Sequence, residues 1–167
     1  VCEASKQEIL RRYYTALCDE RRGSCDKDVV MKLELLIKKA GTNIKDRPVA
    51  GAALIKADVT DLPAAAIELP DGKVVTGRTS ELLGASSAML LNALKYLAGL
   101  PDEKPIISPH IIEPVQSLKT EFLGNGNPRL HTDELLVALS ICAVTSEDAS
   151  NALKQLPKLR DCEMHSS

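Results

Sequence analysis

AAAIELPDGKVVTG, the sequence of residues 64–77, decides the fold class of this chain. Two short apolar runs flank Pro70-Asp71-Gly72, and an Asp-Gly turn between such runs is typical of a β-hairpin. The segments on either side of this stretch have a helical period instead. Because a hairpin needs helices to cover its apolar face, the pattern predicts an α/β fold.

The residues before the hairpin predict three helices. Apolar side chains recur at helical spacing over residues 3–22 and 26–40, and each run ends at a glycine. Asp46 is the expected cap of a third, Ala-rich helix. We therefore expect residues 1–60 to form a helical subdomain.

The residues after the hairpin predict four more helices and one more strand. Helical patterns begin near residues 85, 109, 132 and 146, with Thr132 as the expected cap of the third of them. The run Pro105-Ile106-Ile107-Ser108 predicts a short buried strand. We expect residues 61–167 to form a three-layer α/β/α sandwich around a small mixed sheet, truncated at its C-terminal end.

Composition excludes several classes of partner. Apolar residues make up 44% and charged residues 26%, which is ordinary for a globular protein. The net charge of −2 and the 2% aromatic content predict no nucleic-acid binding. No apolar run is long enough to predict a membrane span. The five cysteines include no C-x-x-C pair, which favours free thiols in the cytoplasm.

Two stretches, residues 69–94 and 127–163, carry a resemblance, and the opening residues 2–8 fit it as well. They resemble the C-terminal half of a bacterial family of uncharacterised proteins, catalogued as domain of unknown function 1846. The resemblance covers nearly the whole chain and implies that the chain is a fragment of a longer cytosolic protein. It implies a preceding domain of nucleotide-binding fold as a partner, and a scaffold similar to cytidine deaminases. It implies no established activity.

The zinc motif of the deaminases is absent from this sequence. That site needs H-x-E and P-C-x-x-C to hold the metal and move protons, and neither pattern occurs. We therefore predict no metal and no cofactor, with a nucleotide or a phosphate as the conceivable ligand.

An anion site is predicted after the hairpin. Gly72-x-x-x-x-Gly77-Arg78-Thr79 imitates a P-loop, but its middle residues form the predicted strand, so the geometry required for phosphate binding is missing. A simpler site survives this objection, because free amides at a helix start bind anions. Its candidate residues are Arg78, Thr79, Ser80, Ser86 and Ser87. The alternative is ordinary capping by Ser and Thr side chains.

A second polar cluster opens the helix near residue 132. His131 is the candidate ligand or proton carrier, with Asp133 as the partner that orients it. Arg129 is the candidate for a further anion contact. The alternative interpretation is a helix start with acidic first-turn residues, which involves no chemistry.

Two functions follow from these patterns. In the first, the two clusters converge and bind a phosphorylated or carboxylated metabolite or a nucleotide, as half of an active site in the full-length protein. In the second, the chain is a non-catalytic structural and oligomerisation module whose leading helices form the interface of a homo-oligomer. The sequence leaves open whether the chain is an enzyme.

Overall fold

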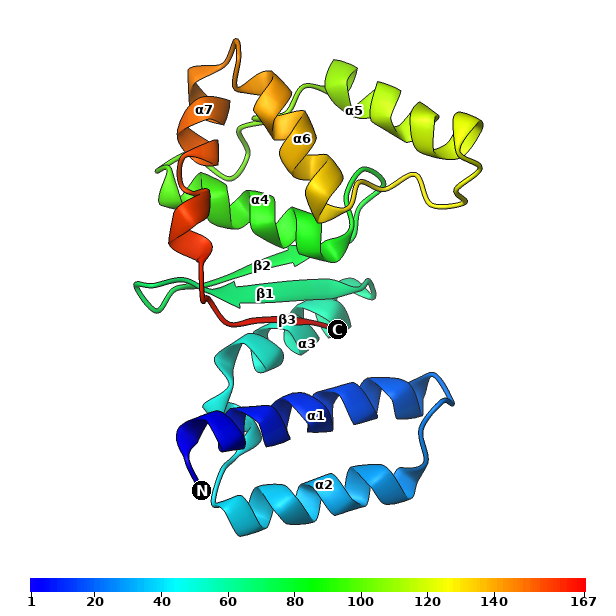
Figure 1. Cartoon of the computed structure of the whole chain (residues 1–167), viewed down its shortest axis with the longest axis vertical. Helices are drawn as coiled ribbons and strands as arrows, with labels where there is room; N and C mark the ends of the chain where they lie inside the picture. Colours follow the sequence, from blue (N-terminus) through cyan, green and yellow to red (C-terminus); the bar gives the residue numbers. More distant parts are fainter.

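The computed structural model describes all residues of the chain, 1–167 (Figure 1). The α-helices are α1 (Glu3–Arg21), α2 (Lys27–Ala40), α3 (Pro48–Thr60), α4 (Ala85–Leu97), α5 (Pro109–Ser117), α6 (Thr132–Cys142) and α7 (Glu147–Leu153). The shorter helical turns are η1 (Ile44–Asp46), η2 (Leu118–Phe122) and η3 (Leu156–Leu159), and the strands are β1 (Ala64–Glu68), β2 (Val74–Arg78) and β3 (Met164–Ser166). The α/β class predicted from the sequence is therefore confirmed.

The sheet has the strand order β2-β1-β3 and is antiparallel throughout. The predicted hairpin is confirmed, with Ala66 opposite Thr76 and Gly72 in the turn at φ 81°. The expectation of a mixed sheet is wrong, because β3 also runs antiparallel to β1. The prediction of a strand at residues 105–108 is wrong as well. That segment is irregular, and its two isoleucines are buried in the helical core without pairing to a strand.

Successive residues of β1 contact different helices because side chains alternate along a strand. Ala65 and Ile67 pack in a cluster with residues of α4, whereas Ala66 packs with residues of α3. Gly77 of β2 makes the approach of α4 close. A Cβ atom on this glycine would lie 2.0 Å from the backbone nitrogen of Met89. The small side chains of the hairpin thus bring the start of α4 close to the end of β2.

The largest core cluster lies between α4 and the helices that follow it. Leu94 of α4 and Leu130, Leu135 and Leu139 are fully buried there. Figure 1 shows α5, α6 and α7 on the α4 side of the sheet. Helix α6 therefore packs against α4, and the N-terminal ends of the two helices lie close together.

Helices α1 and α2 form a hairpin with a core of its own. Leu10, Tyr13, Val30 and Ile37 are among its buried residues. Gly41 ends α2 at φ 62°, as its position in the sequence predicts. In Figure 1 this hairpin lies at the end of the molecule remote from α5 to α7. None of the helices is both long and apolar enough to cross a membrane.

Two predicted helix caps are each displaced by one residue. Asp46 belongs to η1, where its carboxylate accepts from the N–H of Asn43 at 2.8 Å, and Arg47 precedes α3 instead. Thr132 is the first residue of α6, and His131 is its cap. Neither Arg47 nor His131 makes a side-chain cap hydrogen bond to its helix, so no cap side chain marks these two helix starts.

Candidate functional site

A polar pocket of about 400 Å³ lies where α4 and α6 begin. Its walls come from the loop before β1, the loop after β2, the starts of both helices, and β3. The lining residues are Pro63, Thr79, Gly84, Ala85, Ser86, Ser87, His131, Thr132 and Ser166. Four of the site residues predicted from the sequence are thus brought together, namely Thr79, Ser86, Ser87 and His131.

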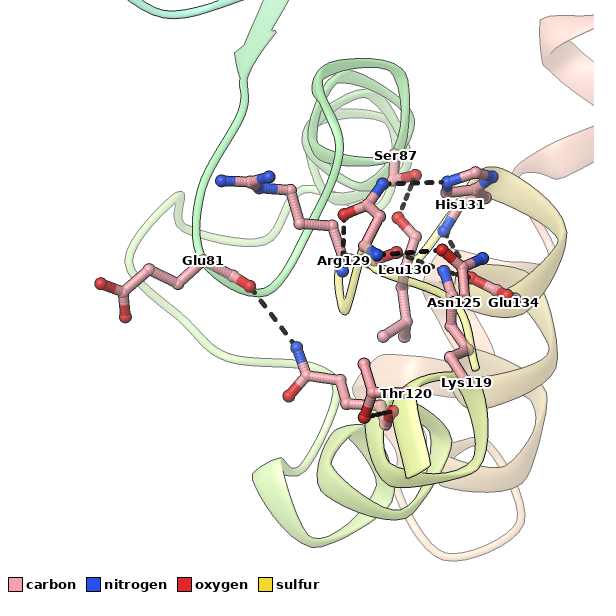
Figure 2. Close-up of polar contacts among 11 residues, drawn as sticks. Glu81, Ser87, Lys119, Thr120, Asn125, Arg129, Leu130, His131 and Glu134 are labelled. Carbon is pink, nitrogen blue, oxygen red and sulfur yellow. Dashed lines mark hydrogen bonds and ion pairs between the residues drawn. The ribbon is translucent and has the colours of Figure 1, made fainter. Parts of the chain in front are cut away.

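Leu130 holds the two helix starts side by side. Its carbonyl oxygen accepts from the N–H of Gly84 at 3.2 Å and from Ser87 Oγ at 2.9 Å. Its N–H donates to the carbonyl of Leu82 at 2.9 Å. These bonds form an isolated parallel bridge between Leu83 and Leu130. Because Leu130 is fully buried, the bridge is shielded from water. Figure 2 shows the hydrogen bond from Ser87 to Leu130.

The starts of both helices present free backbone donors. The first amides of an α-helix have no partner within the helix, since its hydrogen bonds run four residues back. The N–H groups of Ala85, Ser86 and Ser87 have no acceptor within the chain, and no side chain caps α4. The N–H groups of Thr132 and Asp133 at the start of α6 have none either. The positive ends of the two helix dipoles therefore meet at the same pocket, and the acidic first-turn residues Asp133 and Glu134 partly offset that of α6.

Hydroxyl groups supplement these amides. Thr79 and Ser86 are partly exposed, and their side chains make no hydrogen bond within the chain. Ser87 differs, because its Oγ is engaged with Leu130 and its side chain is buried. We conclude that Thr79 and Ser86 have hydroxyls available to a ligand, whereas Ser87 serves the architecture of the pocket.

His131 is fixed by its backbone. Its N–H donates to Glu134 Oε2 at 2.8 Å, and its ring nitrogen Nε2 lies 3.4 Å from the side-chain nitrogen of Asn127. Glu134 also accepts from the buried ammonium of Lys119 at 2.8 Å, and Lys119 donates to the carbonyl of Arg129 (Figure 2). Together these bonds hold the loop before α6 against the helix.

The charge of Glu134 depends on the same bonds. Burial alone would raise the pKa of this carboxyl, but the hydrogen bonds from Lys119 and from the N–H of His131 outweigh burial and lower the pKa below its ordinary value. Glu134 is therefore ionised in the folded protein at neutral pH, and its negative charge stabilises the N-terminal end of α6.

The two predicted arginines do not line the pocket. Arg78 is exposed and lies opposite Ala64 in the sheet, one position after Gly77, which faces α4, so its side chain leaves the other face of the sheet. Arg129 Nε donates to the carbonyl of Ser80 at 2.7 Å. In Figure 2 its guanidinium extends away from His131.

Ser80 and Asp133 also lie outside the pocket lining. Ser80 Oγ accepts from the N–H groups of Leu82 and Leu83 and so shapes the loop before α4. Asp133 is exposed in the first turn of α6, and no hydrogen bond joins it to His131. Its negative charge favours the helix start, as the alternative interpretation of this cluster expects.

Several lining residues were not predicted from the sequence. Gly84 and Thr132 adjoin predicted residues, and the helix starts themselves were the signal for them. Ser166 belongs to β3, which has only three residues and no recognisable period. Pro63 gives no chemical signal at all. The five cysteines are free thiols, and no group of three His, Cys, Asp or Glu side chains is placed to hold a metal ion.

Comparison with known proteins places the sequence of this chain in a family. The model described as "Domain of unknown function DUF1846, C-terminal" matches residues 45–167, and "Domain of unknown function DUF1846, N-terminal" matches residues 1–41. The chain is 54% identical over 165 residues to "UPF0371 protein cu0538" of Corynebacterium urealyticum, covering 99% of this chain and 33% of that protein. It is 52% identical to a UPF0371 protein of Corynebacterium glutamicum, with the same coverage. It is 47% identical to "UPF0371 protein SpyM50764" of Streptococcus pyogenes, again over 99% of this chain and 33% of that protein. The chain thus spans about a third of the length of these relatives.

Proposed function

The chain belongs to the DUF1846 family of uncharacterised proteins, and we propose that its polar pocket binds a phosphorylated or carboxylated metabolite, such as a nucleotide. The observation that carries this proposal is the convergence of two helix starts. The first residues of α4 and α6 line one pocket. Each of these helices begins with unpaired backbone amides, at residues 85–87 and 132–133. Two helix starts that line one pocket favour an anion more than a single helix start does.

The chemistry of the lining supports a phosphate or a carboxylate over a neutral ligand. Thr79 and Ser86 have hydroxyls without partners in the chain, and no carboxylate lines the pocket. His131 is the residue that could carry a proton to or from a bound ligand, so a catalytic role would centre on it. In the full-length protein a second domain would complete this pocket as an active site.

Other expectations stay predictions. The preceding domain of nucleotide-binding fold, the likeness to the cytidine-deaminase scaffold and the cytoplasmic location come from the sequence and its resemblance. Four predicted site residues lie outside the pocket lining, namely Arg78, Ser80, Arg129 and Asp133. They would contact a ligand only if their side chains moved or if the ligand extended out of the pocket.

Thermal unfolding with added anions tests the proposal. Inorganic phosphate, nucleoside monophosphates and sugar phosphates are compared at equal ionic strength with chloride. A ligand at a hundred times its dissociation constant stabilises the fold by about 2.7 kcal/mol, which raises the melting temperature measurably. If none of these anions raises the melting temperature above the chloride control, the proposal is wrong.

A variant that introduces a negative charge locates the binding. Ser86→Asp places a carboxylate at the start of α4, where it favours the helix but repels a bound anion. Ser5→Asp is the matched control, because Ser5 lies in the exposed first turn of α1, remote from the pocket. We expect Ser86→Asp to abolish the stabilisation by phosphate and Ser5→Asp to retain it.

A structural role is the second candidate, and helix α2 is the observation that favours it. Met31, Leu35 and Leu36 are 53%, 56% and 46% exposed, although α2 already buries another face against α1. Such an apolar surface favours contact with another copy or another domain. Met31→Lys with Leu35→Lys would then abolish a homo-oligomer in sedimentation velocity. If the unaltered chain sediments as a monomer, this chain alone forms no homo-oligomer.

A further inference from the structure

Three polar side chains meet in the interior between the helical hairpin and the sheet. Tyr14 comes from α1, Arg47 precedes α3, and His165 comes from β3. Tyr14 is 2% exposed and Arg47 is 5% exposed. The rings of Tyr14 and His165 lie edge to face, with centroids 5.0 Å apart. This cluster therefore joins the residues matched by the N-terminal family model to those matched by the C-terminal model.

The charge of Arg47 is balanced by a single carboxylate. Its Nη2 donates to Glu163 Oε2 at 3.0 Å and to the carbonyl of Met164 at 3.2 Å. Glu163 is 56% exposed on its side chain, so water already screens this pair. The carboxylate that approaches the cluster is thus engaged with Arg47 and does not contact the imidazole.

The imidazole of His165 has no partner for a second proton. Its buried Nε2 makes no hydrogen bond within the chain, and neither do the hydroxyl of Tyr14 or the Nε and Nη1 atoms of Arg47. Two titratable or charged groups face the imidazole, Tyr14 from α1 and Arg47 ahead of α3. A third, Glu163, precedes β3 and acts on the imidazole only through its ion pair with Arg47. A proton on His165 would place a second cation beside Arg47 in a buried environment.

We propose that His165 is a proton-operated latch, which holds α1 against β3 when it is neutral and releases the α1–α2 hairpin from the sheet when it is protonated. The neutral ring packs against Tyr14 and tolerates the guanidinium of Arg47. The imidazolium repels that guanidinium and requires hydration, so it favours a conformation in which Tyr14 has moved away and water reaches the ring.

The pH window follows from the sign of the pKa shift. Burial, and secondarily the charge of Arg47, lower the pKa of His165 below its ordinary value of 6.5. The open or unfolded state therefore binds the proton more strongly than the closed state does. The stability of the contact is fully present above pH 6.5 and declines as the pH falls from there toward the lowered pKa.

Hydrogen–deuterium exchange of the whole chain tests the latch. Between pH 7.5 and 5, with rates corrected for intrinsic exchange, we expect protection of α1 to decline relative to that of α4. The expected decline is about tenfold for each unit by which the pKa of His165 is lowered. Unchanged relative protection of α1 across this range would overturn the proposal.

Two kinds of variant separate the latch from general acid sensitivity. His165→Gln cannot titrate, so the ratio of α1 to α4 protection should become independent of pH, whatever its absolute value. His110→Gln removes an exposed histidine outside this cluster and should keep the behaviour of the unaltered chain. A pH dependence in His165→Gln equal to that of the unaltered chain would assign the effect to another group. As a second measurement, the imidazole of His165, followed by NMR, should titrate below 6.5, and titration at or above that value would also contradict the latch.

Discussion

Ser87 donates a hydrogen bond through Oγ to the carbonyl of Leu130 at 2.9 Å, and this bond joins the first turn of α4 to the residue that precedes the cap of α6. The same carbonyl accepts from the N–H of Gly84. Two segments are thereby fixed side by side, although the bonded residues are 43 positions apart in the sequence. The polar pocket exists because of this junction.

Ser87→Ala should weaken the junction without removing it. The lost hydrogen bond contributes about 1 kcal/mol to the free energy of unfolding, while Gly84 continues to donate to Leu130. We expect this loss in urea unfolding, together with weaker binding of phosphate. Ser140→Ala is the matched control, since its Oγ bonds to the exposed carbonyl of Val137 and its removal should change stability by less than about 0.5 kcal/mol. Equal losses in the two variants would contradict this role of Ser87.

Gly77→Ala should be strongly destabilising. The added Cβ would lie 2.0 Å from Met89 N, a backbone atom that cannot move without displacing α4. Overpacking costs about 1–3 kcal/mol in the free energy of unfolding, and a clash with backbone places this variant at the upper end of that range.

Gly51→Ala gives the matched comparison for Gly77. Gly51 lies within α3, and a Cβ atom there would meet no atom within 4 Å. Alanine is the better helix former, so this variant should gain about 0.5–1 kcal/mol. Chemical denaturation of both variants measures the contrast, and a Gly77→Ala protein as stable as Gly51→Ala would refute the close approach of α4 to β2.

Glu134→Gln should destabilise the loop before α6. The variant replaces the ion pair between Glu134 and the buried ammonium of Lys119 by a hydrogen bond from that ammonium to a neutral amide, at a cost of about 1.5–3 kcal/mol. Because the folded pKa of Glu134 is lowered, its contribution is present above the ordinary pKa of 4.5 and declines as the pH falls through the folded value. Urea unfolding at pH 7 and at decreasing pH should therefore show the two proteins converging in acid. A constant difference down to pH 2 would contradict the assignment.

Local sequence patterns predicted the hairpin and the helices because turns and helix ends depend on neighbouring residues. Gly41 and Gly72 occupy left-handed conformations that few other residues adopt, so the sequence predicts a helix end at Gly41 and a turn at Gly72. The apolar run at residues 105–108 indicates a strand by its pattern, yet Ile106 and Ile107 are buried in an irregular segment, because apolar residues enter a core in loops as well as in strands.

The pocket itself was only partly predictable. The helix starts with Ser86 and His131 were recognisable, whereas their meeting depends on Leu130, a residue without functional chemistry. Arg129 was assigned to a ligand because of its charge, but the fold supplies the carbonyl of Ser80 as its acceptor. Such tertiary partners have no local signature. The same holds for Ser166, which reaches the pocket through the pairing of β3 with β1.

NMR titration with inorganic phosphate tests most directly whether two helix starts bind one anion. Amide resonances of Ser86, Ser87 and Thr132 should shift together, with one dissociation constant, and the amide of Ser5 at the start of α1 should stay unchanged. Ser86→Asp should suppress all three shifts at once. If phosphate shifts none of these amides, or shifts α4 and α6 with different dissociation constants, the two helix starts do not form one site.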